Sequence, residues 1–245
     1  MRFANLAPSL FVLSAFAAPA AQAQLTFYTT RASFDAACPG LTIENWENAR
    51  ISNDAASGEH GPIDKNTNDA IFHPGDIQDG IRVDSNPHQA NGNGLAVTGN
   101  GFDGTDTKKI FGNLFGDKLD IFFYNNNSTC VGMDVSSVDV SRVGSGTVDF
   151  NVYGTSGLIG TSSVLAGAPG VFIGVQNTAG VITRINLSPR AVQVAGVDNV
   201  AFGRTASVAV PEPGSLALLA GMTVTGAGFF LRRRKTRANA LKTKA

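Results

Sequence analysis

Turn-forming residues recur at short intervals between residues 24 and 209, and this spacing leaves no room for long helices. Gly, Asn, Asp and Pro interrupt the chain, and no long 3.6-residue period of apolar residues lies between them. The segments between these turns have strand patterns instead. In the clearest of them, residues 147–153, apolar and polar side chains alternate, which places Val148, Phe150 and Val152 on one face. Residues 181–187 alternate in the same way. These patterns predict an all-β domain.

Other segments rich in β-branched or aromatic residues predict further strands. They are residues 25–29, 41–46, 81–84, 94–98, 118–124, 131–140, 157–164, 171–176 and 200–202. Only residues 31–37 predict a helix, with Thr30 as its N-cap. About ten short strands joined by turns are typical of a two-sheet β-sandwich, and we expect a jelly roll over residues 24–209. Residues 51–93, poor in apolar residues, are expected to form long surface loops that would carry any site.

The N-terminal residues have the three regions of a secretory signal peptide. Arg2 supplies a positive start, an apolar stretch follows, and Ala21-Gln22-Ala23 is a small-x-small cleavage site. We therefore expect residues 1–23 to be removed after Ala23. Export to an oxidising compartment would allow Cys38 and Cys130, the two cysteines, to form a disulfide, although the sequence does not give the distance between their Cα atoms.

A second hydrophobic segment lies near the C-terminus. Residues 216–231 carry no charge, and as a helix they would span about 24 Å, short of the ~30 Å hydrocarbon core. Snorkelling arginines and local thinning can close that gap, so we expect a single transmembrane helix. The basic cluster after it predicts a cytoplasmic end and an exported domain before it. The formal net charge of zero therefore combines an acidic domain with a basic tail.

The motif Val210-Pro211-Glu212-Pro213 precedes this hydrophobic segment, and Arg232-Arg233-Arg234 follows it. Together these C-terminal features resemble the PEP-CTERM sorting signal of Gram-negative bacteria, a signal also labelled after the C-terminus of ice-binding proteins. The resemblance covers residues 210–235, and the basic tail of residues 236–245 is longer than usual. It implies processing by an exosortase-type membrane transpeptidase, transient residence in the inner membrane, and delivery to the outer surface or to a biofilm matrix. The residues that carry it are Val210, Pro211, Glu212, Pro213, Arg232, Arg233 and Arg234.

A looser resemblance covers the domain itself. Residues 34–47 look like the first strands of many PEP-CTERM ectodomains, and residues 171–203 look like their closing strands. Related jelly rolls, such as MAM and galactose-binding-like domains, often hold a structural cation between a Glu after an early aromatic residue and an Asp of the last strand. The resemblance therefore implies a calcium site at Glu47, which follows Trp46, and Asp198.

Other acidic and histidine residues offer weaker sites. Asp103 and Asp106 form a second option for calcium, but they lack the spacing of an EF-hand, and Asp is common in turns. His60, His73 and His88 are scattered, which favours exposed loop histidines over a zinc site.

Catalysis would need a carboxyl pair, and Glu44 and Glu47 point to opposite faces of a regular strand. Glu59 with Asp54 or Asp64 is the remaining pair. Trp46 is either a sugar-stacking platform or, as for most aromatic residues in central strands, part of the core.

The sequence thus favours a non-catalytic, exported surface protein that binds or structures extracellular polysaccharide. The alternative is a surface glycan-active enzyme, a hydrolase or lyase, on a jelly-roll fold. Ice binding usually requires a regular Thr face, and the Thr residues here are dispersed. No basic domain suited to nucleic acid is present.

Overall fold

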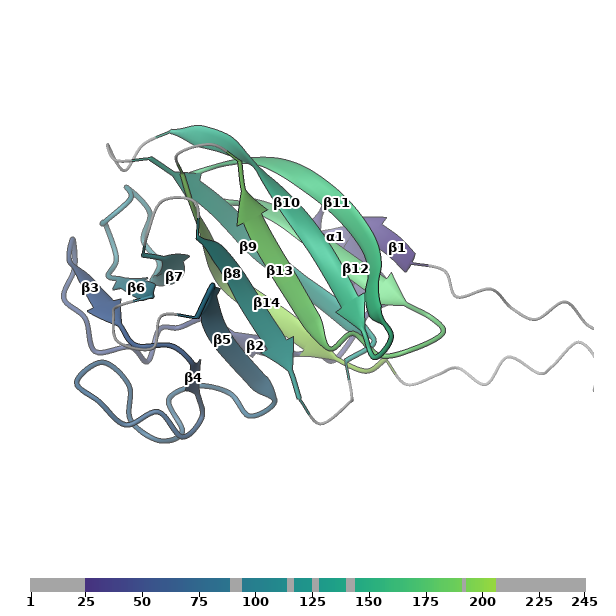
Figure 1. The fold of residues 1–245 in the computed structure, drawn as a ribbon, viewed down its shortest axis with the longest axis horizontal. Helices are drawn as coiled ribbons and strands as arrows, with labels where there is room; N and C mark the ends of the chain where they lie inside the picture. Colours follow the sequence, from purple (N-terminus) through teal and green to yellow (C-terminus); the bar gives the residue numbers. More distant parts are fainter. Residues whose placement is uncertain are drawn as a thin grey trace, which may run out of the picture. The chain divides into compact units, whose positions relative to one another are not determined.

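The computed structural model describes residues 25–88, 94–113, 117–124, 128–139, 144–190 and 193–205 (Figure 1). Within these ranges the chain forms fourteen strands and one short helix. The paired strands run antiparallel and belong to two sheets. The all-β prediction is confirmed for this part of the chain.

The larger sheet has eight strands in the order β1-β12-β9-β14-β7-β6-β3, with β2 paired to β14 beside this path. Its strands are β1 (Leu25–Tyr28), β2 (Thr42–Glu44), β3 (Ala56–Glu59), β6 (Leu95–Thr98), β7 (Lys109–Gly112), β9 (Cys130–Val138), β12 (Val171–Asn177) and β14 (Val194–Gly203). Strand β14, the last in the chain order, lies between β9 and β7. The sheet therefore forms only when distant segments of the chain meet.

The smaller sheet has six strands in the order β11-β10-β13-β8-β5-β4. Its strands are β4 (Ile63–Asp64), β5 (Ile81–Asn86), β8 (Lys118–Phe123), β10 (Ser145–Gly154), β11 (Gly157–Gly167) and β13 (Arg184–Pro189). The hairpin of β10 and β11 pairs Val148 with Val164, and a register shift follows Val152.

One apolar core fills the space between the two sheets. Val148, Phe150 and Val152 of β10 are fully buried in it, together with inward-facing residues of both sheets. Since side chains alternate along a strand, Asp149 and Asn151 point away from the core. The expected two-sheet β-sandwich is confirmed.

Helix α1 (Arg31–Ala37) begins at the predicted residue, where Thr30 Oγ1 accepts a hydrogen bond from the Ser33 amide at 3.3 Å. The helix buries Phe34 against the outer face of the larger sheet, opposite Gly132 and Gly174. A Cβ atom at Gly132 would lie 2.7 Å from the Phe34 ring, and one at Gly174 would lie 2.6 Å from it. Both positions need glycine for the helix to lie this close.

A disulfide joins the end of this helix to the larger sheet. Cys38, the C-cap of α1, is bonded to Cys130 at the start of β9, with a Cα–Cα distance of 6.3 Å. The predicted pairing is therefore confirmed, and it links residues 92 positions apart.

The expectation that residues 51–93 form surface loops is wrong in part. The segment contains β3 and β4, which were not predicted, and it buries Ile63, Phe72 and Ile77 in the core. These apolar residues stand singly or in one short run, Ala70-Ile71-Phe72, among polar ones, so they produce no period. Their backbone is held instead by side chains such as Asp69, whose Oδ1 accepts hydrogen bonds from the amides of Ile71 and Phe72 at 2.6 and 2.7 Å.

The outer faces of the two sheets differ in what covers them. Helix α1 packs on the larger sheet through Phe34, Phe172 and Ala201, and the side chain of Lys109 is buried on the same face. The strands of the smaller sheet face the viewer in Figure 1, and no described helix or strand lies over them.

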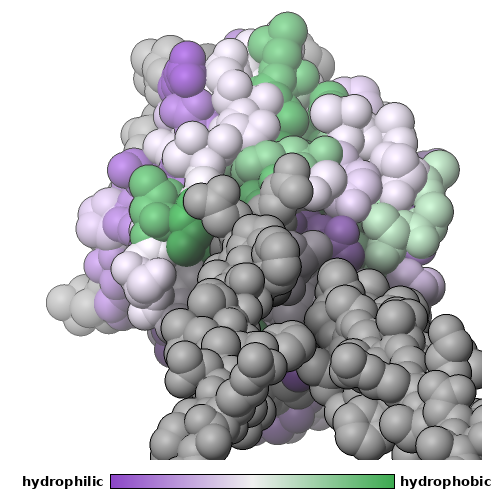
Figure 2. Space-filling model, turned by 90° about the vertical axis from the view of Figure 1, so that its right-hand side faces the viewer, coloured by the Kyte–Doolittle hydropathy of each residue, from purple (hydrophilic) through white to green (hydrophobic). Residues whose placement is uncertain are grey.

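Exposed apolar side chains do not gather into one large area on the described surface. The large exposed ones are Ile43, Leu158, Leu165 and Val171, which belong to three different strands. Figure 2, which views one end of the molecule, likewise shows hydrophobic residues in separate patches among hydrophilic ones. The uncovered face of the six-stranded sheet is therefore the better candidate for a binding surface.

Candidate functional site

Side chains of the six-stranded sheet form rows across its outer face. Strand register places Tyr153 opposite Arg184, Arg184 opposite Phe122, and Phe122 opposite Arg82. Directly opposed side chains on one face of a sheet lie close enough to interact. We call Tyr153, Arg184, Phe122 and Arg82 the stacked row.

Arginine side chains alternate with aromatic rings along the stacked row. The Cζ atom of Arg184 lies 3.8 Å from the ring centroid of Tyr153 and 5.9 Å from that of Phe122. The Cζ atom of Arg82 lies 4.4 Å from the Phe122 centroid. Cation–π contacts of this kind hold flat side chains in fixed orientations. The row is therefore organised before any ligand arrives.

A network of amide and carboxylate groups runs beside the stacked row. Asn151 Nδ2 donates to Asn186 Oδ1 at 3.2 Å, and Asn186 Nδ2 donates to Asp120 Oδ1 at 2.6 Å. Asp120 Oδ2 accepts from Asn86 Nδ2 at 2.9 Å and from Arg184 Nη1 at 3.2 Å. The network thus connects four strands and anchors one arginine of the stacked row.

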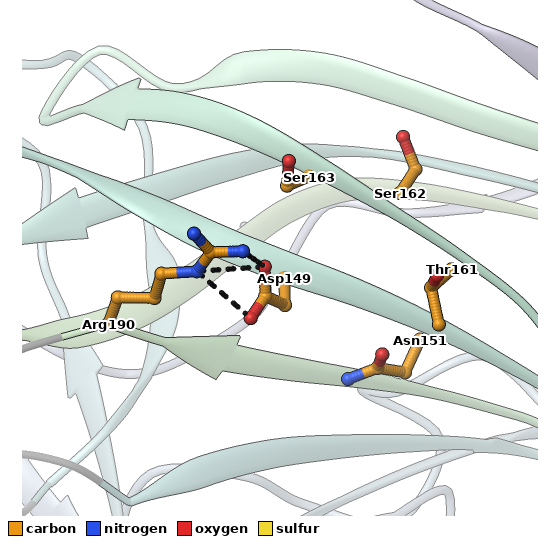
Figure 3. Close-up of a pocket in the computed structure, with 6 residues that line it drawn as sticks. All are labelled: Asp149, Asn151, Thr161, Ser162, Ser163 and Arg190. Carbon is orange, nitrogen blue, oxygen red and sulfur yellow. Dashed lines mark hydrogen bonds and ion pairs between the residues drawn. The ribbon is translucent and has the colours of Figure 1, made fainter.

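A polar hollow of about 480 Å³ lies at the β10–β11 end of the same sheet (Figure 3). Arg190 closes one side of it and binds Asp149 through three hydrogen bonds of 2.7–3.1 Å. These hydrogen bonds raise the pKa of the Arg190 guanidinium, so it stays charged at any ordinary pH. The lining residues are Asp149, Asn151, Thr161, Ser162, Ser163 and Arg190. Hydroxyl, amide, carboxylate and guanidinium groups therefore face one space, as recognition of a polyhydroxylated ligand requires.

The two residues predicted to bind calcium, Glu47 and Asp198, are hydrogen-bonded to neighbouring residues of one segment, Lys108 and Thr107. Lys108 donates from its amide to Glu47 Oε1 at 3.1 Å, and its ammonium donates to the Glu47 carbonyl at 2.8 Å. Asp198 is buried in β14 and accepts from the Asn199 amide at 2.7 Å and from the Thr107 hydroxyl. No described hydrogen bond or ion pair joins the two carboxylates. Calcium at Glu47 and Asp198 stays a prediction.

Burial dominates the electrostatics of Asp198. Desolvation raises the pKa of its carboxyl group from 3.8 to about 6, and the neighbouring Asp134 carboxylate adds to this effect. Hydrogen bonds from Asn199 and Thr107 and the charge of Lys109 oppose it. The group therefore titrates close to neutral pH.

The second calcium option, Asp103 and Asp106, is not assembled around a common centre. Asp103 is buried, and its Oδ2 accepts from Lys109 Nζ at 2.7 Å, while Asp106 is exposed. Lys109 Nζ also donates to the Ala168 carbonyl at 2.6 Å. A buried ammonium thus takes the place that a cation would have at Asp103. Among the described residues, no group of three His, Cys, Asp or Glu side chains could hold a metal ion.

Glu59, the candidate for a catalytic pair, is buried in β3 and accepts a hydrogen bond from the His60 amide at 2.9 Å. Burial raises the pKa of its carboxyl group, and the carboxylate that adds to this effect is Asp69, not Asp54 or Asp64. Asp64 belongs to β4 in the other sheet. Sequence reasoning missed Asp69 because only the fold brings it near Glu59.

Trp46 is a core residue, so the sugar-platform interpretation is wrong. Its side chain is fully buried, and its backbone is in the left-handed region with φ 58°. Glu44 holds this turn, since its two carboxylate oxygens accept from the Trp46 and Gln78 amides, each at 2.7 Å. Burial raises the pKa of the Glu44 carboxyl group against these hydrogen bonds.

The three histidines are exposed, as expected. His88 Nδ1 lies 3.0 Å from Asp84 Oδ1. Their exposure agrees with the interpretation as loop residues.

The predicted signal peptide, with cleavage after Ala23, and the predicted sorting signal at residues 210–235 lie outside the described residues. No helix in the described part of the chain is long and apolar enough to cross a membrane.

No protein family and no curated protein match the sequence. Three solved structures are similar to part of this chain. A family 6 carbohydrate-binding module, studied for its binding subsites, is 20% identical over 47% of this chain and 86% of its own, with a TM-score of 0.28. CsCBM6-3 from Clostridium stercorarium, in complex with cellobiose, is 20% identical over 46% and 83%, with a TM-score of 0.28.

The third structure contains the CBM22-1 and GH10 modules of the Clostridium thermocellum endo-1,4-β-D-xylanase 10B, complexed with xylohexaose. It is 15% identical over 47% of this chain and 26% of its own, with a TM-score of 0.30. Likeness at this level defines no family and assigns no residue of this chain to a site.

Proposed function

We propose that this protein is an exported, non-catalytic surface or matrix protein that binds extracellular polysaccharide on the outer face of its six-stranded sheet. One observation carries the proposal: flat, polar and aromatic side chains lie in register across a sheet face that no described helix or strand covers. A sugar chain presents hydroxyl groups at regular intervals, and strands about 4.8 Å apart offer donors and acceptors at regular intervals as well.

The pre-arranged hydrogen bonds favour binding because little side-chain freedom remains to be lost. Asn151 can donate and accept, and it is already held in place by Asn186, which is itself buried. We therefore place one sugar-binding subsite in the polar hollow and a longer contact along the partly exposed stacked row towards β5.

Export and sorting belong to the same proposal and are supported by other features. The Cys38–Cys130 bond is of a kind that persists in oxidising compartments. The predicted signal peptide and the PEP-CTERM-like residues would lead the domain, a sandwich of the jelly-roll kind, to the surface of a Gram-negative bacterium, with an exosortase-type transpeptidase as processing partner.

The proposal is tested by measuring the affinity of the purified protein for a panel of polysaccharides, including the extracellular polymer of its host. Asn151→Ala removes a lining residue of the hollow and is expected to weaken binding about fivefold, since a hydrogen bond contributes about 1 kcal/mol. Gln176→Ala, on the larger sheet, is the matched control and should bind as the wild type does.

Equal binding by the wild type and Asn151→Ala would contradict the proposed face. Release of sugars by the wild type, abolished in Glu59→Gln, would support the alternative of a glycan-active enzyme instead.

A further inference from the structure

The stacked row presents its ring faces to arginines rather than to solvent. Neutral sugars stack on open aromatic faces, but here the Tyr153 ring lies 3.8 Å from the Arg184 guanidinium carbon and the Phe122 ring lies 4.4 Å from that of Arg82. Phe122 also has Arg184 on the side of β13, at 5.9 Å. The row therefore offers little open ring face for a neutral sugar.

Stacking leaves the edges of a guanidinium group available. Its N–H groups point outward in its own plane, so a guanidinium held against a ring can still donate two parallel hydrogen bonds to an anion. Arg184 uses Nη1 for Asp120, at 3.2 Å. This contact fixes the plane of Arg184 and partly neutralises its charge.

Arg82 differs from the other arginines of this face because it has no acidic partner among the described residues. Arg184 pairs with Asp120 and Arg190 pairs with Asp149, both within 3.2 Å. No described hydrogen bond or ion pair joins Arg82 to another side chain, and its Nε atom is buried without a partner. The two terminal Nη groups are not buried and make no described hydrogen bond, so they remain able to donate to a ligand acceptor.

Asp64 does not fill this role. It lies opposite Arg82 in the β4–β5 register, but its Oδ1 accepts from the Asn66 amide at 2.7 Å. The flat Arg82 guanidinium, stacked on Phe122, is therefore already oriented to donate two parallel hydrogen bonds to an anion.

We propose that the polysaccharide bound by this face is acidic, and that Arg82 recognises an anionic substituent of its sugar units, a carboxylate or a sulfate ester. This inference rests on the proposed function and specifies its substrate class. Arg184 lies two strands away from Arg82 on the same row, about 10 Å, so a polymer with repeated anionic groups can engage both. The domain as a whole is acidic, so it does not attract an anionic polymer over long distances. Recognition therefore depends on the short-range hydrogen bonds that Arg82 donates.

The test compares the affinity of the full-length protein for matched pairs of polymers. Polygalacturonate is compared with its carboxyl-reduced form, and dextran sulfate is compared with dextran. We expect at least a tenfold preference for one charged polymer over its neutral partner, and the pair that shows it identifies the anion as carboxylate or sulfate.

Variants of Arg82 locate the preference. Arg82→Gln should remove it, and Arg82→Lys, which keeps the charge but loses the two parallel hydrogen bonds, should lose most of it. Arg204→Gln removes one exposed positive charge outside the row and should keep the preference. Unchanged thermal unfolding midpoints would show that the variants are folded.

Equal affinity for charged and neutral polymers, or an unchanged preference in Arg82→Gln and Arg82→Lys, would overturn the inference while leaving polysaccharide binding in place. Absence of binding to every polymer would overturn both the inference and the proposed function.

Discussion

Asp198 shows how a residue's neighbours in the fold set its chemistry. It lies on the larger sheet opposite Asp134, where Asn199 donates from its backbone to Asp198 and from its side chain to Asp134. Arg31 of helix α1 donates to the Asn199 carbonyl at 2.7 Å. Burial in this cluster is the largest cause of the raised Asp198 pKa.

The raised pKa predicts a pH-dependent stability. The folded carboxyl group, with a pKa of about 6, holds its proton more tightly than the unfolded one, near 3.8. Its stabilising contribution is therefore complete below about pH 4 and is lost as the pH rises through about 6, a change of about 3 kcal/mol. Urea unfolding at several pH values between 4 and 7 measures this: the free energy of unfolding of the wild type, relative to that of Asp198→Asn, should fall by about this amount as the pH rises. Asp35→Asn, in the exposed part of α1, is the control. Parallel pH profiles for the wild type and Asp198→Asn would refute the assignment.

At the scale of elements, helix α1 is attached to the larger sheet by two independent means. Phe34 packs over Gly132 and Gly174, and Cys38 is bonded to Cys130 of β9. The Phe34 ring also lies 5.5 Å from the Phe172 ring, centroid to centroid. The helix thus covers the sheet face that would otherwise compete with the smaller sheet as a binding surface.

Removal of the disulfide should loosen this attachment. The Cys38→Ser/Cys130→Ser double variant is expected to lower the free energy of unfolding by about 2–5 kcal/mol, because the bond closes a long loop and restricts the unfolded chain. Urea titrations of the variant, and of the wild type with and without reductant, measure the effect. Coincident titrations for oxidised and reduced wild type would show that α1 is held by packing alone.

At the scale of the whole molecule, helix α1 packs on part of the outer face of the larger sheet, whereas no described helix or strand lies over the smaller sheet. We propose that the smaller sheet meets the polysaccharide. Such a role requires the domain to leave the cell. The two predicted signals at the ends of the chain would provide the route.

The export proposal predicts the mass of the protein in its host. Intact mass measured in separate cell fractions should reveal a species that begins at Gln24, ends near residues 211–214, and lies outside the inner membrane. The precursor with both ends serves as the reference mass. A protein that keeps residues 216–235 in the inner membrane would instead be a plain membrane anchor, and the matrix role would lose its main support.

The sequence alone determined the features that depend on neighbouring residues. Alternation at Val148, Phe150 and Val152 predicts both the strand and the face it buries, because successive side chains of a strand point to opposite sides. Thr30 likewise marks the start of α1, because an N-cap bonds an amide only a few residues ahead. The class of fold follows from such local patterns.

The tertiary structure alone decided which distant residues meet. Arg82, Phe122, Tyr153 and Arg184 come from four strands, and none of them stands out in its own segment of sequence. Their alignment depends on the register between strands far apart in the chain, as do the burial of Trp46 and the pairing of Lys109 with Asp103. Register is fixed by packing of the whole core, so a site built across strands becomes visible only when the sheets are assembled.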